Sequence, residues 1–256
     1  MSYSKRRGDI LKLLQDEGSV SITELASRLG VSLETVRRDV KLLTDDGSAV
    51  RMHGAVGLAL HLGEAPFERR MRENAEAKRA VARMAAVTIR NGDTIMLDTG
   101  TTTSFLAREL LQHRDLTVVT NSSDIARTLA TVNGNRVYMA GGELRSDSGA
   151  ALGVSAIEFV SQFSVSHAII SIGAVDAEAG LMDYDLEEAE FARAVLTRGS
   201  RTVVVTDHTK FGRHGLVRVC SLSGVGEMVT DEMPPPELLD ALRAANVKLS
   251  VAGVLA

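Results

Sequence analysis

Short apolar runs alternate with stretches of helical periodicity from residue 94 to residue 251 of this 256-residue chain. The runs are rich in Val, Ile and Thr and have the length of buried strands. Strands that alternate with helices in this way form a mostly parallel sheet with helices on both faces, so we predict an α/β domain. The predicted strands are Thr94–Leu97, Leu116–Thr120, Arg136–Ala140, Ala168–Ile172, Thr202–Thr206, Met228–Thr230 and Lys248–Val251. The predicted helices are Ser104–Leu111, Asp124–Ala130, Ala156–Phe163, Glu187–Leu196 and Pro236–Ala244.

The first 57 residues lack this alternation and predict three short helices followed by a hairpin. Apolar residues line one side of a first helix around Ile10–Leu14, and Ser21–Glu24 forms a capping box that begins a second. Gly30 ends that helix, and Ser32 is a favourable N-cap for a third. Helices joined by such a tight turn form a helix-turn-helix, and the alternating segment Ala49–Val56 predicts a β-hairpin wing.

A proline beside a dense run of charged residues separates the two patterns. The proline is Pro66 and the charged run is Glu68–Glu73. Because this composition suits a hinge between domains, we predict a winged helix-turn-helix at residues 1–57, a linker at 58–73 and the α/β domain at 74–256.

Polar residues on the third helix and the wing are candidates for contacts with double-stranded DNA. The net charge of −4 gives no general attraction to DNA, so binding depends on where the cations lie. Arg37 and Arg38 can offer paired donors to guanine edges or phosphates, and Arg51 can enter a minor groove or touch the backbone. The predicted DNA-binding residues are Ser32, Thr35, Arg37, Arg38, Lys41, Arg51 and His53. Spacing alone also permits a small helical subdomain that binds no DNA.

Polar residues follow five of the predicted strands, at the edge where parallel sheets bind ligands. In Asp98–Thr103, a glycine among threonines at a helix start offers backbone N–H groups, hydroxyls and a helix dipole, which suit phosphate. The segment lacks the lysine of a P-loop. The other groups are Asn121–Ser122, Gly141–Glu143, Gly173 with Asp176, and Asp207–Phe211. Each group alone could be a cap or a turn, but five on one edge predict a site for a phosphorylated small molecule.

Several stretches of the first domain resemble the DeoR family of bacterial transcriptional regulators. They are Glu24-Leu-Ala, the long stretch Val31-Ser-x-Glu-Thr-Val-Arg-Arg-Asp39, and Arg51-x-His-Gly54. A second glycine usually follows the last of these in the family, whereas this chain has Ala55, so the tip of the wing departs from the pattern. The resemblance covers the whole chain. It implies a sequence-specific DNA-binding repressor whose sensor domain is similar in fold to ribose-5-phosphate isomerase.

The resemblance also implies which residues bind the effector. They are Asp98, Gly100, Thr101, Thr102, Asn121, Gly142, Glu188, Asp207 and Lys210. The first four would hold the phosphate, and Asp207 with Glu188 would face the hydroxyl groups. The domain predicted at residues 74–256 would therefore sense a phosphorylated metabolite.

Other stretches resemble the subgroup of the family that responds to glycerol 3-phosphate. They are Ala140–Ser146, Phe159–Phe163, Asp183–Asp185, His208–Arg213 and Pro234–Pro236. They imply a repressor of a carbon-catabolic operon that sn-glycerol 3-phosphate releases from its operator. A repressor that answers to a different sugar phosphate is the alternative.

Two other classes of protein compete with a repressor. A sugar-phosphate isomerase could use the carboxylates and the lysine of the predicted pocket as acid–base groups, but a helix-turn-helix has no role in such an enzyme. Cys220 is the single cysteine and the six histidines are scattered, so we expect no catalytic pair, no metal and no cofactor. An architectural DNA-binding protein would have no use for a phosphate loop.

The remaining expectations concern location and assembly. A single cysteine allows no intrachain disulfide, which fits a reducing cytosol. We find neither a signal peptide nor an apolar run near the roughly 18 residues of a membrane helix, so we expect a cytoplasmic protein without a membrane partner. One short recognition helix reads few bases, which predicts a homodimer or homotetramer.

Overall fold

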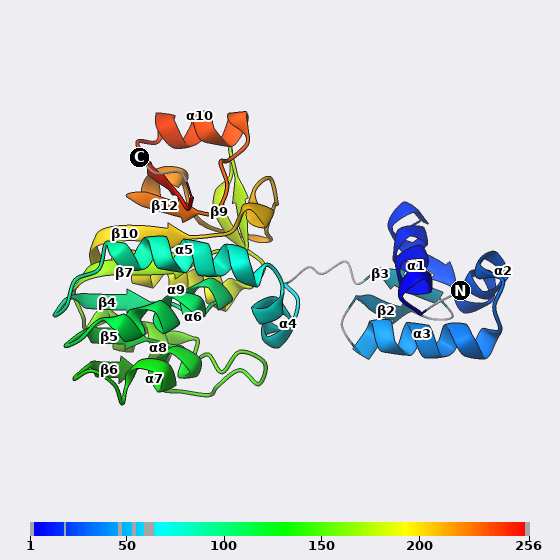
Figure 1. Ribbon diagram of the computed structural model, residues 1–256, viewed down its shortest axis with the longest axis horizontal. Coiled ribbons are helices and arrows are strands. Elements are labelled where there is room, and N and C mark those ends of the chain that lie inside the picture. Colours follow the sequence, from blue (N-terminus) through cyan, green and yellow to red (C-terminus); the bar gives the residue numbers. More distant parts are fainter. Residues whose placement is uncertain (1–2, 18, 46–47, 53–54, 59–63, 254–256) are drawn as a thin grey trace. The chain divides into compact units, whose positions relative to one another are not determined.

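A computed structural model divides the chain into two compact units, Met1–Ala65 and Pro66–Ala256. The described residues are 3–17, 19–45, 48–52, 55–58 and 64–253. Within its described residues, the N-terminal unit has three helices and a three-stranded antiparallel sheet in the order β1-β3-β2 (Figure 1). Its elements are α1 (Tyr3–Glu17), β1 (Ser19–Ser21), α2 (Ile22–Leu29), α3 (Leu33–Asp45), β2 (Ala49–Met52) and β3 (Ala55–Leu58).

The N-terminal unit confirms the predicted winged helix-turn-helix. The Ser21 side chain caps α2 by accepting a hydrogen bond from Glu24 N at 3.1 Å. Gly30 ends α2 in the left-handed conformation, with φ of 63°, which favours glycine. One apolar core joins the helices to the small sheet, and its buried members include Ile10, Leu14, Val20, Leu25, Val36, Val40, Leu43, Ala49 and Val56.

The C-terminal unit is built on a seven-stranded parallel sheet in the order β13-β12-β10-β7-β4-β5-β6 (Figure 1). The strands are β4 (Thr94–Leu97), β5 (Thr117–Thr120), β6 (Arg136–Met139), β7 (Val165–Ser171), β10 (Gly199–Val205), β12 (Glu227–Thr230) and β13 (Lys248–Val251). The helices are α4 (Phe67–Arg72), α5 (Ala75–Val87), α6 (Thr101–Glu109), α7 (Ser123–Leu129), α8 (Val154–Ser161), α9 (Leu186–Leu196) and α10 (Pro236–Ala244). Three 3-10 turns are η1 (Leu110–Gln112), η2 (His208–Lys210) and η3 (Leu222–Gly224). The predicted strands and helices of this domain are all present, with ends that differ by a few residues.

The C-terminal unit also contains a second, antiparallel sheet in the order β11-β9-β8, which the sequence did not predict. Its strands are β8 (Ala174–Asp176), β9 (Gly180–Asp183) and β11 (Val217–Cys220). Strands this short carry little periodicity. Asp176, grouped above with the residues at the sheet edge, instead caps the β8–β9 turn, where its Oδ1 accepts from Glu178 N and Ala179 N at 2.9 and 2.7 Å.

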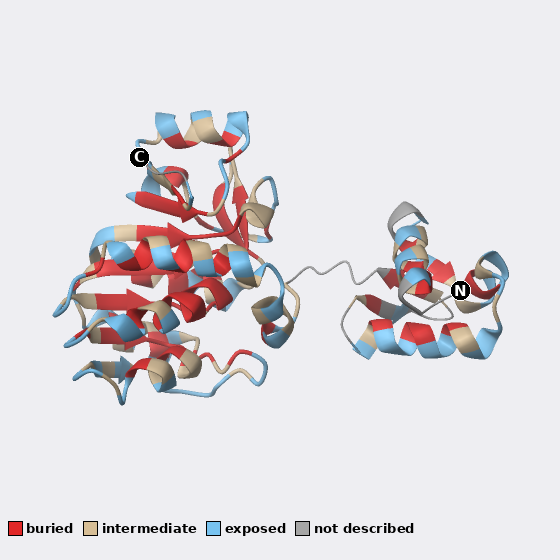
Figure 2. Ribbon diagram, viewed as in Figure 1, coloured by how far each residue is buried: buried red, intermediate tan, exposed pale blue. Residues whose placement is uncertain are grey.

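Alternate side chains of each central strand point to opposite faces of the large sheet. Ile95 and Leu97 belong to a core formed with α5, α6 and α7, whereas Met96 belongs to a core formed with α8, α9 and α10. Figure 2 shows the buried residues concentrated in the strands and on the inner sides of these helices. Helices therefore cover both faces, as the alternating pattern predicts.

The strand order reverses beside β4. The chain passes from β4 to β5 and β6 on one side, and it returns to β7 on the other side of β4. Open α/β sheets bind ligands beyond the carboxyl ends of the strands at such a switch point. We call the ends of the parallel strands near Leu97, Thr120, Ser171 and Val205 the carboxyl edge, and the opposite ends the amino edge.

The helix α4 lies within the range predicted as a linker, yet it packs in the C-terminal unit. Phe67 is buried, and Met71 packs against the core that α5 and α6 share. The C-terminal unit therefore begins with α4.

Candidate DNA interface and effector site

The helix α3 has a buried apolar face and an exposed charged face. Val36, Val40 and Leu43 are fully buried, and their contacts fix the rotation of the helix within its unit. The exposed residues include the predicted DNA contacts Arg37, Arg38 and Lys41. Arg37 Nη1 lies 3.8 Å from Glu34 Oε2, and both side chains are mostly exposed, so this ion pair leaves Arg37 able to reach a partner.

Two of the predicted DNA contacts also begin α3. Ser32 Oγ accepts from Thr35 N at 3.2 Å and lies 2.9 Å from Thr35 Oγ1. The neighbouring acidic residue of the family signature has a structural role, because Asp39 is 1% exposed and accepts from Arg6 Nε at 2.7 Å. This buried ion pair joins α1 to α3 and leaves the arginines of the signature facing solvent.

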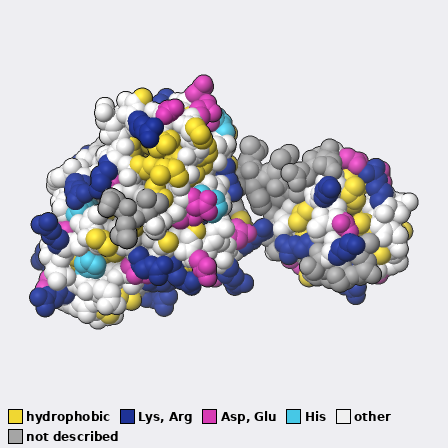
Figure 3. Space-filling view, turned by 45° about the horizontal axis from the view of Figure 1, so that its top comes forward, with side chains coloured by type: hydrophobic (Ala, Val, Ile, Leu, Met, Phe, Trp, Pro, Cys, Tyr) yellow, Lys and Arg dark blue, Asp and Glu magenta, His cyan; other side chains and the backbone are white. Residues whose placement is uncertain are grey.

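The wing supplies one further exposed cation. Arg51 is exposed on β2, which pairs with β3, whereas His53 lies outside the described residues. In the view of Figure 3, Lys and Arg side chains of the N-terminal unit are interspersed with Asp and Glu. This distribution agrees with binding through particular side chains and not through net charge.

The predicted effector residues gather at the carboxyl edge because the strands that precede them are neighbours. In sheet order they are Gly142 after β6, Asn121 after β5, Asp98–Thr102 after β4, and Asp207 with Lys210 after β10. β7 lies between β4 and β10 and ends at Ser171. Glu188 comes from a different direction, the first turn of α9.

Asp98 joins the two strands of the switch point. It is 6% exposed, and its two carboxylate oxygens accept from Ser171 N at 3.0 and 3.1 Å. Burial raises the pKa of Asp98 well above its ordinary value, and the negative charges of Asp183 and Glu188 raise it further, against the opposing effect of the Ser171 hydrogen bonds. A raised pKa favours the protonated carboxyl group, which carries no negative charge to repel a phosphate.

Gly100 is required by the close approach of β7. A Cβ at this position would lie 1.8 Å from Ser171 Oγ. Thr103 Oγ1 closes the same turn by donating to the carbonyl oxygens of Asp98 and Gly100, both at 3.0 Å. Thr101 and its neighbour Thr102 are each 5% exposed in the first turn of α6. The turn is thus a rigid and largely buried start of a helix.

Four buried hydroxyl and amide oxygen atoms near this edge have no hydrogen-bond partner among the described residues. They are Thr99 Oγ1, Ser104 Oγ, Asn121 Oδ1 and Ser148 Oγ. The Asn121 Nδ2 donates to Ala151 O at 3.0 Å, which orients the amide and leaves Oδ1 as an acceptor. A buried polar atom without a partner costs roughly 1–3 kcal/mol, so a cluster of them needs an explanation. A ligand that carries hydroxyl groups and a phosphate would satisfy them.

The loop Glu143–Ala151, called the strap, follows β6 and is fastened at two places. Arg145 forms ion pairs with the acidic start of α9, with N–O distances of 2.8, 2.8 and 3.2 Å to Asp185, Glu187 and Glu188. Near the other end, Ala151 N donates to Asn121 O at 2.9 Å, and Gly149 O accepts from Ser123 N at 3.2 Å. The strap therefore brings Ser148 to the carboxyl edge, and it ties Glu188 to the loop that contains Gly142.

The loop after β10 is held by carboxylates. Asp207 is 1% exposed, and its Oδ1 accepts from Thr209 N at 3.1 Å and also from Thr209 Oγ1. Asp231 accepts from His208 N at 2.7 Å and lies 2.6 Å from His208 Nδ1, and this hydrogen bond raises the pKa of His208. Lys210 ends η2 and is half-buried.

Four residues of the carboxyl edge were not predicted from the sequence: Thr99, Arg145, Ser148 and Ser171. Thr99 lies inside the predicted phosphate segment Asp98–Thr103 but was not named as an effector residue. Arg145 was quoted only as part of a stretch that carries the family resemblance. Ser171 lies within a predicted strand, and its bond to Asp98 can be recognised only once β4 and β7 are known to be neighbours. We find no signal in the sequence for Ser148.

Both parts of the chain match known families. Residues 6–60 match the "DeoR-like helix-turn-helix domain", and residues 73–232 match the "DeoR C terminal sensor domain". The chain is 34% identical over 251 residues to the glycerol-3-phosphate regulon repressor of Escherichia coli (strain K12), covering 98% of this chain and 100% of the relative. It is also 34% identical over 249 residues to the transcriptional repressor CsqR of the same strain, covering 97% and 95%.

Solved structures are more distant. Ribose 5-phosphate isomerase A from Methanocaldococcus jannaschii is 17% identical with a TM-score of 0.40, over 54% of this chain and 55% of the other. Among the described residues, no helix has both the length and the apolar character needed to cross a lipid bilayer.

Proposed function

Because the chain belongs to the DeoR family of transcriptional regulators, we propose that it leaves its operator when a phosphorylated small molecule binds at the carboxyl edge. Its relatives are named as repressors and its parts match a DNA-binding and a sensor domain, so it is a regulator and not an enzyme. The observation that carries the effector site is the group of buried oxygen atoms that lack a partner among the described residues.

For DNA, the proposal assigns base and phosphate contacts to the exposed face of α3 and to the wing. Arg37, Arg38 and Lys41 lie on that face, and Ser32 with Thr35 lies at its start, where a phosphate can be approached. The buried pair of Asp39 and Arg6 fixes the helix that carries them. Arg51 and His53 remain proposed contacts of the wing.

The DNA assignment can be tested by removing two cations from α3. A duplex selected from a random library by the wild-type protein serves as the operator. The double variant R37A/R38A should bind it at least about tenfold more weakly at matched salt, because each lost base contact costs roughly 1–3 kcal/mol. The control K5A/K12A removes the same charge from exposed positions of α1 and should bind almost as wild type. Equal loss in both double variants would mean that only net charge matters.

For the effector, the proposal is sn-glycerol 3-phosphate. The first turn of α6 offers backbone N–H groups and a helix dipole to a phosphate, and Lys210 offers a cation. Asn121 Oδ1 and the hydroxyl oxygens of Thr99 and Ser148 are suited to ligand hydroxyl groups. The choice of glycerol rests on the similarity to the glycerol-3-phosphate regulon repressor, and a different sugar phosphate is the alternative because other repressors are equally similar.

The test is an operator-release titration with sn-glycerol 3-phosphate beside glycerol, fructose 6-phosphate, fructose 1-phosphate and ribose 5-phosphate. We expect release by sn-glycerol 3-phosphate at the lowest concentration and none by glycerol. The ligand must bind the DNA-free protein more tightly than the complex in order to release the operator. Stronger release by a hexose or pentose phosphate would refute the glycerol assignment and keep the phosphate-sensing repressor.

The proposal includes assembly as a homodimer or homotetramer. One α3 helix reads only a few base pairs, so two copies are needed for a specific operator. Light scattering of the purified protein with and without the selected duplex measures this. A monomer that binds the operator tightly on its own would contradict it.

A further inference from the structure

One side chain connects the start of the C-terminal unit to the proposed effector site. The chain enters this unit at α4, and Asn74 then turns it from α4 into α5. Asn74 Nδ2 donates to Thr209 Oγ1 at 3.4 Å, across 135 positions of the sequence. We propose that this bond makes α4 respond to the effector, so that a change in the loop Asp207–Lys210 alters how firmly α4 is held. This inference rests on the proposed function and concerns how its site is regulated.

The side chain of Asn74 bonds to Thr209 and does not cap the helix that Asn74 precedes, α5. The Asn74 backbone is left-handed, with φ of 51° and ψ of 33°, a conformation that asparagine tolerates better than most residues. An asparagine at a helix start usually accepts a hydrogen bond from the second or third helical N–H. Here the side chain makes no capping bond to α5, and its amide donates to Thr209 instead.

Thr209 connects Asn74 to Asp207, a residue of the proposed pocket. Its Oγ1 donates to Asp207 Oδ1 and accepts from Asn74, and a hydroxyl can do both at once. A ligand hydroxyl that donates to Asp207 Oδ1 competes with Thr209 for that oxygen. A phosphate that attracts Lys210 pulls the same short turn, η2. Either event changes the position of Thr209 and hence its bond to Asn74.

The helix α4 is the part of this unit that such a change reaches first. Lys78 is 4% exposed, and its Nζ donates to the carbonyl oxygens of Arg70 and Glu73, the latter at 2.9 Å, which closes the end of α4 next to Asn74. α4 also packs on α6, whose first turn is the proposed phosphate site. Figure 1 shows α4 at the end of the sheet where the strands terminate. One part of the proposed site, α6, thus packs on α4, and another, Thr209, contacts the residue that links α4 to α5.

The test uses two variants that remove the bond and two controls that match them. T209V removes the hydroxyl, and N74G removes the amide while glycine keeps the left-handed backbone. T88V removes a hydroxyl from the other end of α5, where Oγ1 donates to Ala85 O at 2.9 Å. N133G removes a left-handed asparagine, with φ of 53°, from the turn before β6, where Nδ2 donates to Leu111 O and His113 O at 2.7 and 2.9 Å.

The first measurement needs no effector. Hydrogen exchange of the segment 66–75 should be several-fold faster in T209V and N74G than in the wild type, T88V and N133G, since the amides of Arg70 and Glu73 are bonded within α4. The double variant should exchange no faster than the faster single variant, because both changes remove the same bond. Unchanged exchange in T209V would overturn the proposal whatever the effector is.

The second measurement compares operator affinity with and without a saturating effector, using the panel compound that releases the wild type. A coupling of about 5- to 150-fold is usual for a regulated protein. In T209V and N74G this ratio should fall to less than about a third of the wild-type value. N74G, which changes a residue outside the proposed pocket, should also keep effector affinity within about threefold. Full release by T209V would overturn the link and keep the proposed function. Faster exchange in T209V, with no release of the wild type by any compound, would support the link and overturn the proposed effector class.

Discussion

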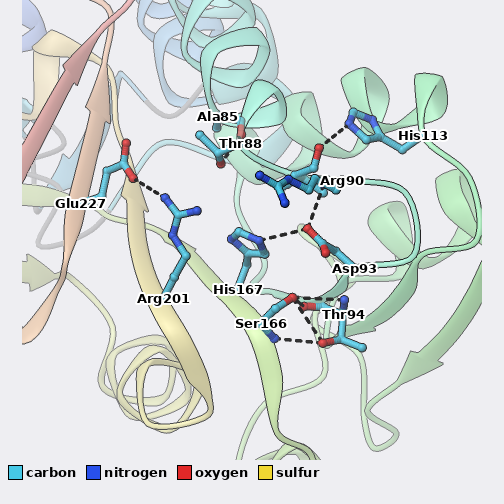
Figure 4. Close-up of polar contacts among 11 residues, drawn as sticks. Ala85, Thr88, Arg90, Asp93, Thr94, His113, Ser166, His167, Arg201 and Glu227 are labelled. Atoms are coloured by element: carbon cyan, nitrogen blue, oxygen red, sulfur yellow. Dashed lines mark hydrogen bonds and ion pairs between the residues drawn. The ribbon is translucent and has the colours of Figure 1, made fainter.

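The two edges of the large parallel sheet use buried polar groups in different ways. At the amino edge, polar side chains bond to one another (Figure 4). The contacts are His167 Nε2 to Asp93 Oδ2 at 3.2 Å, Ser166 N to Thr94 Oγ1 at 2.9 Å, and Glu227 to Arg201, Lys248 and Ser250 at 3.4, 2.9 and 2.7 Å. At the carboxyl edge, buried oxygen atoms of Thr99, Asn121 and Ser148 have no partner among the described residues.

The difference separates polar groups that hold the fold from polar groups that are open to a ligand. The amino edge has two unpartnered atoms of its own in the described residues, Nδ1 of His113 and of His167. Each ring places Nε2 beside an oxygen, so Nε2 carries the proton of the neutral ring and Nδ1 is left as an acceptor. The contrast therefore lies in the clustered hydroxyl and amide oxygens, which occur at the switch point of the sheet and not at the opposite edge.

Removing one lysine from each edge should give the largest difference. Lys210→Ala should weaken effector binding about 10- to 100-fold, because a charge-assisted hydrogen bond contributes roughly 1.5–3 kcal/mol. Lys248→Ala removes the same charge from the amino edge, where Nζ lies 2.9 Å from Glu227 Oε1. It should leave effector affinity within about twofold. Calorimetry with the compound that releases the operator measures both, and equal affinities would place the pocket away from Lys210.

Two threonines, one at the start of β4 and one just after its end, test whether the two edges differ in their contribution to stability. Thr94→Val leaves Ser166 N without its acceptor and should lower the free energy of unfolding by about 1–3 kcal/mol, with effector affinity unchanged. Thr99→Val breaks no hydrogen bond of the described residues. It should keep or slightly raise the free energy of unfolding and weaken effector binding about 3- to 10-fold, because one hydrogen bond contributes about 1 kcal/mol.

Urea unfolding followed by circular dichroism and calorimetry with the effector separate these two outcomes. The valine keeps the shape of threonine, so neither variant creates a cavity. A loss of stability in Thr99→Val as large as in Thr94→Val would show that the Thr99 hydroxyl has a structural partner. The distinction between the two edges would then fail at this position.

Much of this contrast could be predicted from the sequence, because parallel strands bring their carboxyl ends to one edge. Apolar runs located β4, β5 and β10, and the polar residues that follow them were identified by position alone. The long-range partners of buried carboxylates could not be predicted in the same way. Asp98 depends on Ser171, 73 positions away, and Asp39 depends on Arg6, 33 positions away. Such partners are fixed by tertiary packing, which leaves no periodic signal.

The family signature shows the same limit at the level of single residues. The stretch that ends in Arg37-Arg38-Asp39 carried the family resemblance as one motif, yet the structure gives its residues different roles. Arg37 and Arg38 are exposed, whereas Asp39 is 1% exposed and serves the core of its unit. The three residues are adjacent in the sequence. The sequence alone does not show which of them faces α1 and which faces solvent.

The smallest expected effects come from one histidine at each edge, with opposite signs. At the amino edge, burial lowers the pKa of His167, and the charge of Arg201 lowers it further against the opposing effect of Asp93. At the carboxyl edge, the hydrogen bond to Asp231 raises the pKa of His208, although partial burial opposes this. An unfolded histidine titrates near 6.5, so each native shift makes stability depend on pH.

The sign of each dependence follows from which state binds more protons. Below about pH 6.5 the unfolded chain protonates His167 more readily than the native protein does, so its contribution is lost as the pH falls. The native protein holds the proton of His208 at a pH where the unfolded chain has released it. The contribution of His208 to stability is therefore present below about pH 6.5 and is lost as the pH rises through the native pKa.

The difference in unfolding free energy between wild type and His167→Gln should therefore shrink from pH 7 to pH 5.5. The corresponding difference for His208→Gln should shrink from pH 6 to pH 8, and less steeply, because solvent screens this more exposed side chain. Urea unfolding across this range measures both slopes, and slopes of the same sign would contradict the opposite roles of the two edges.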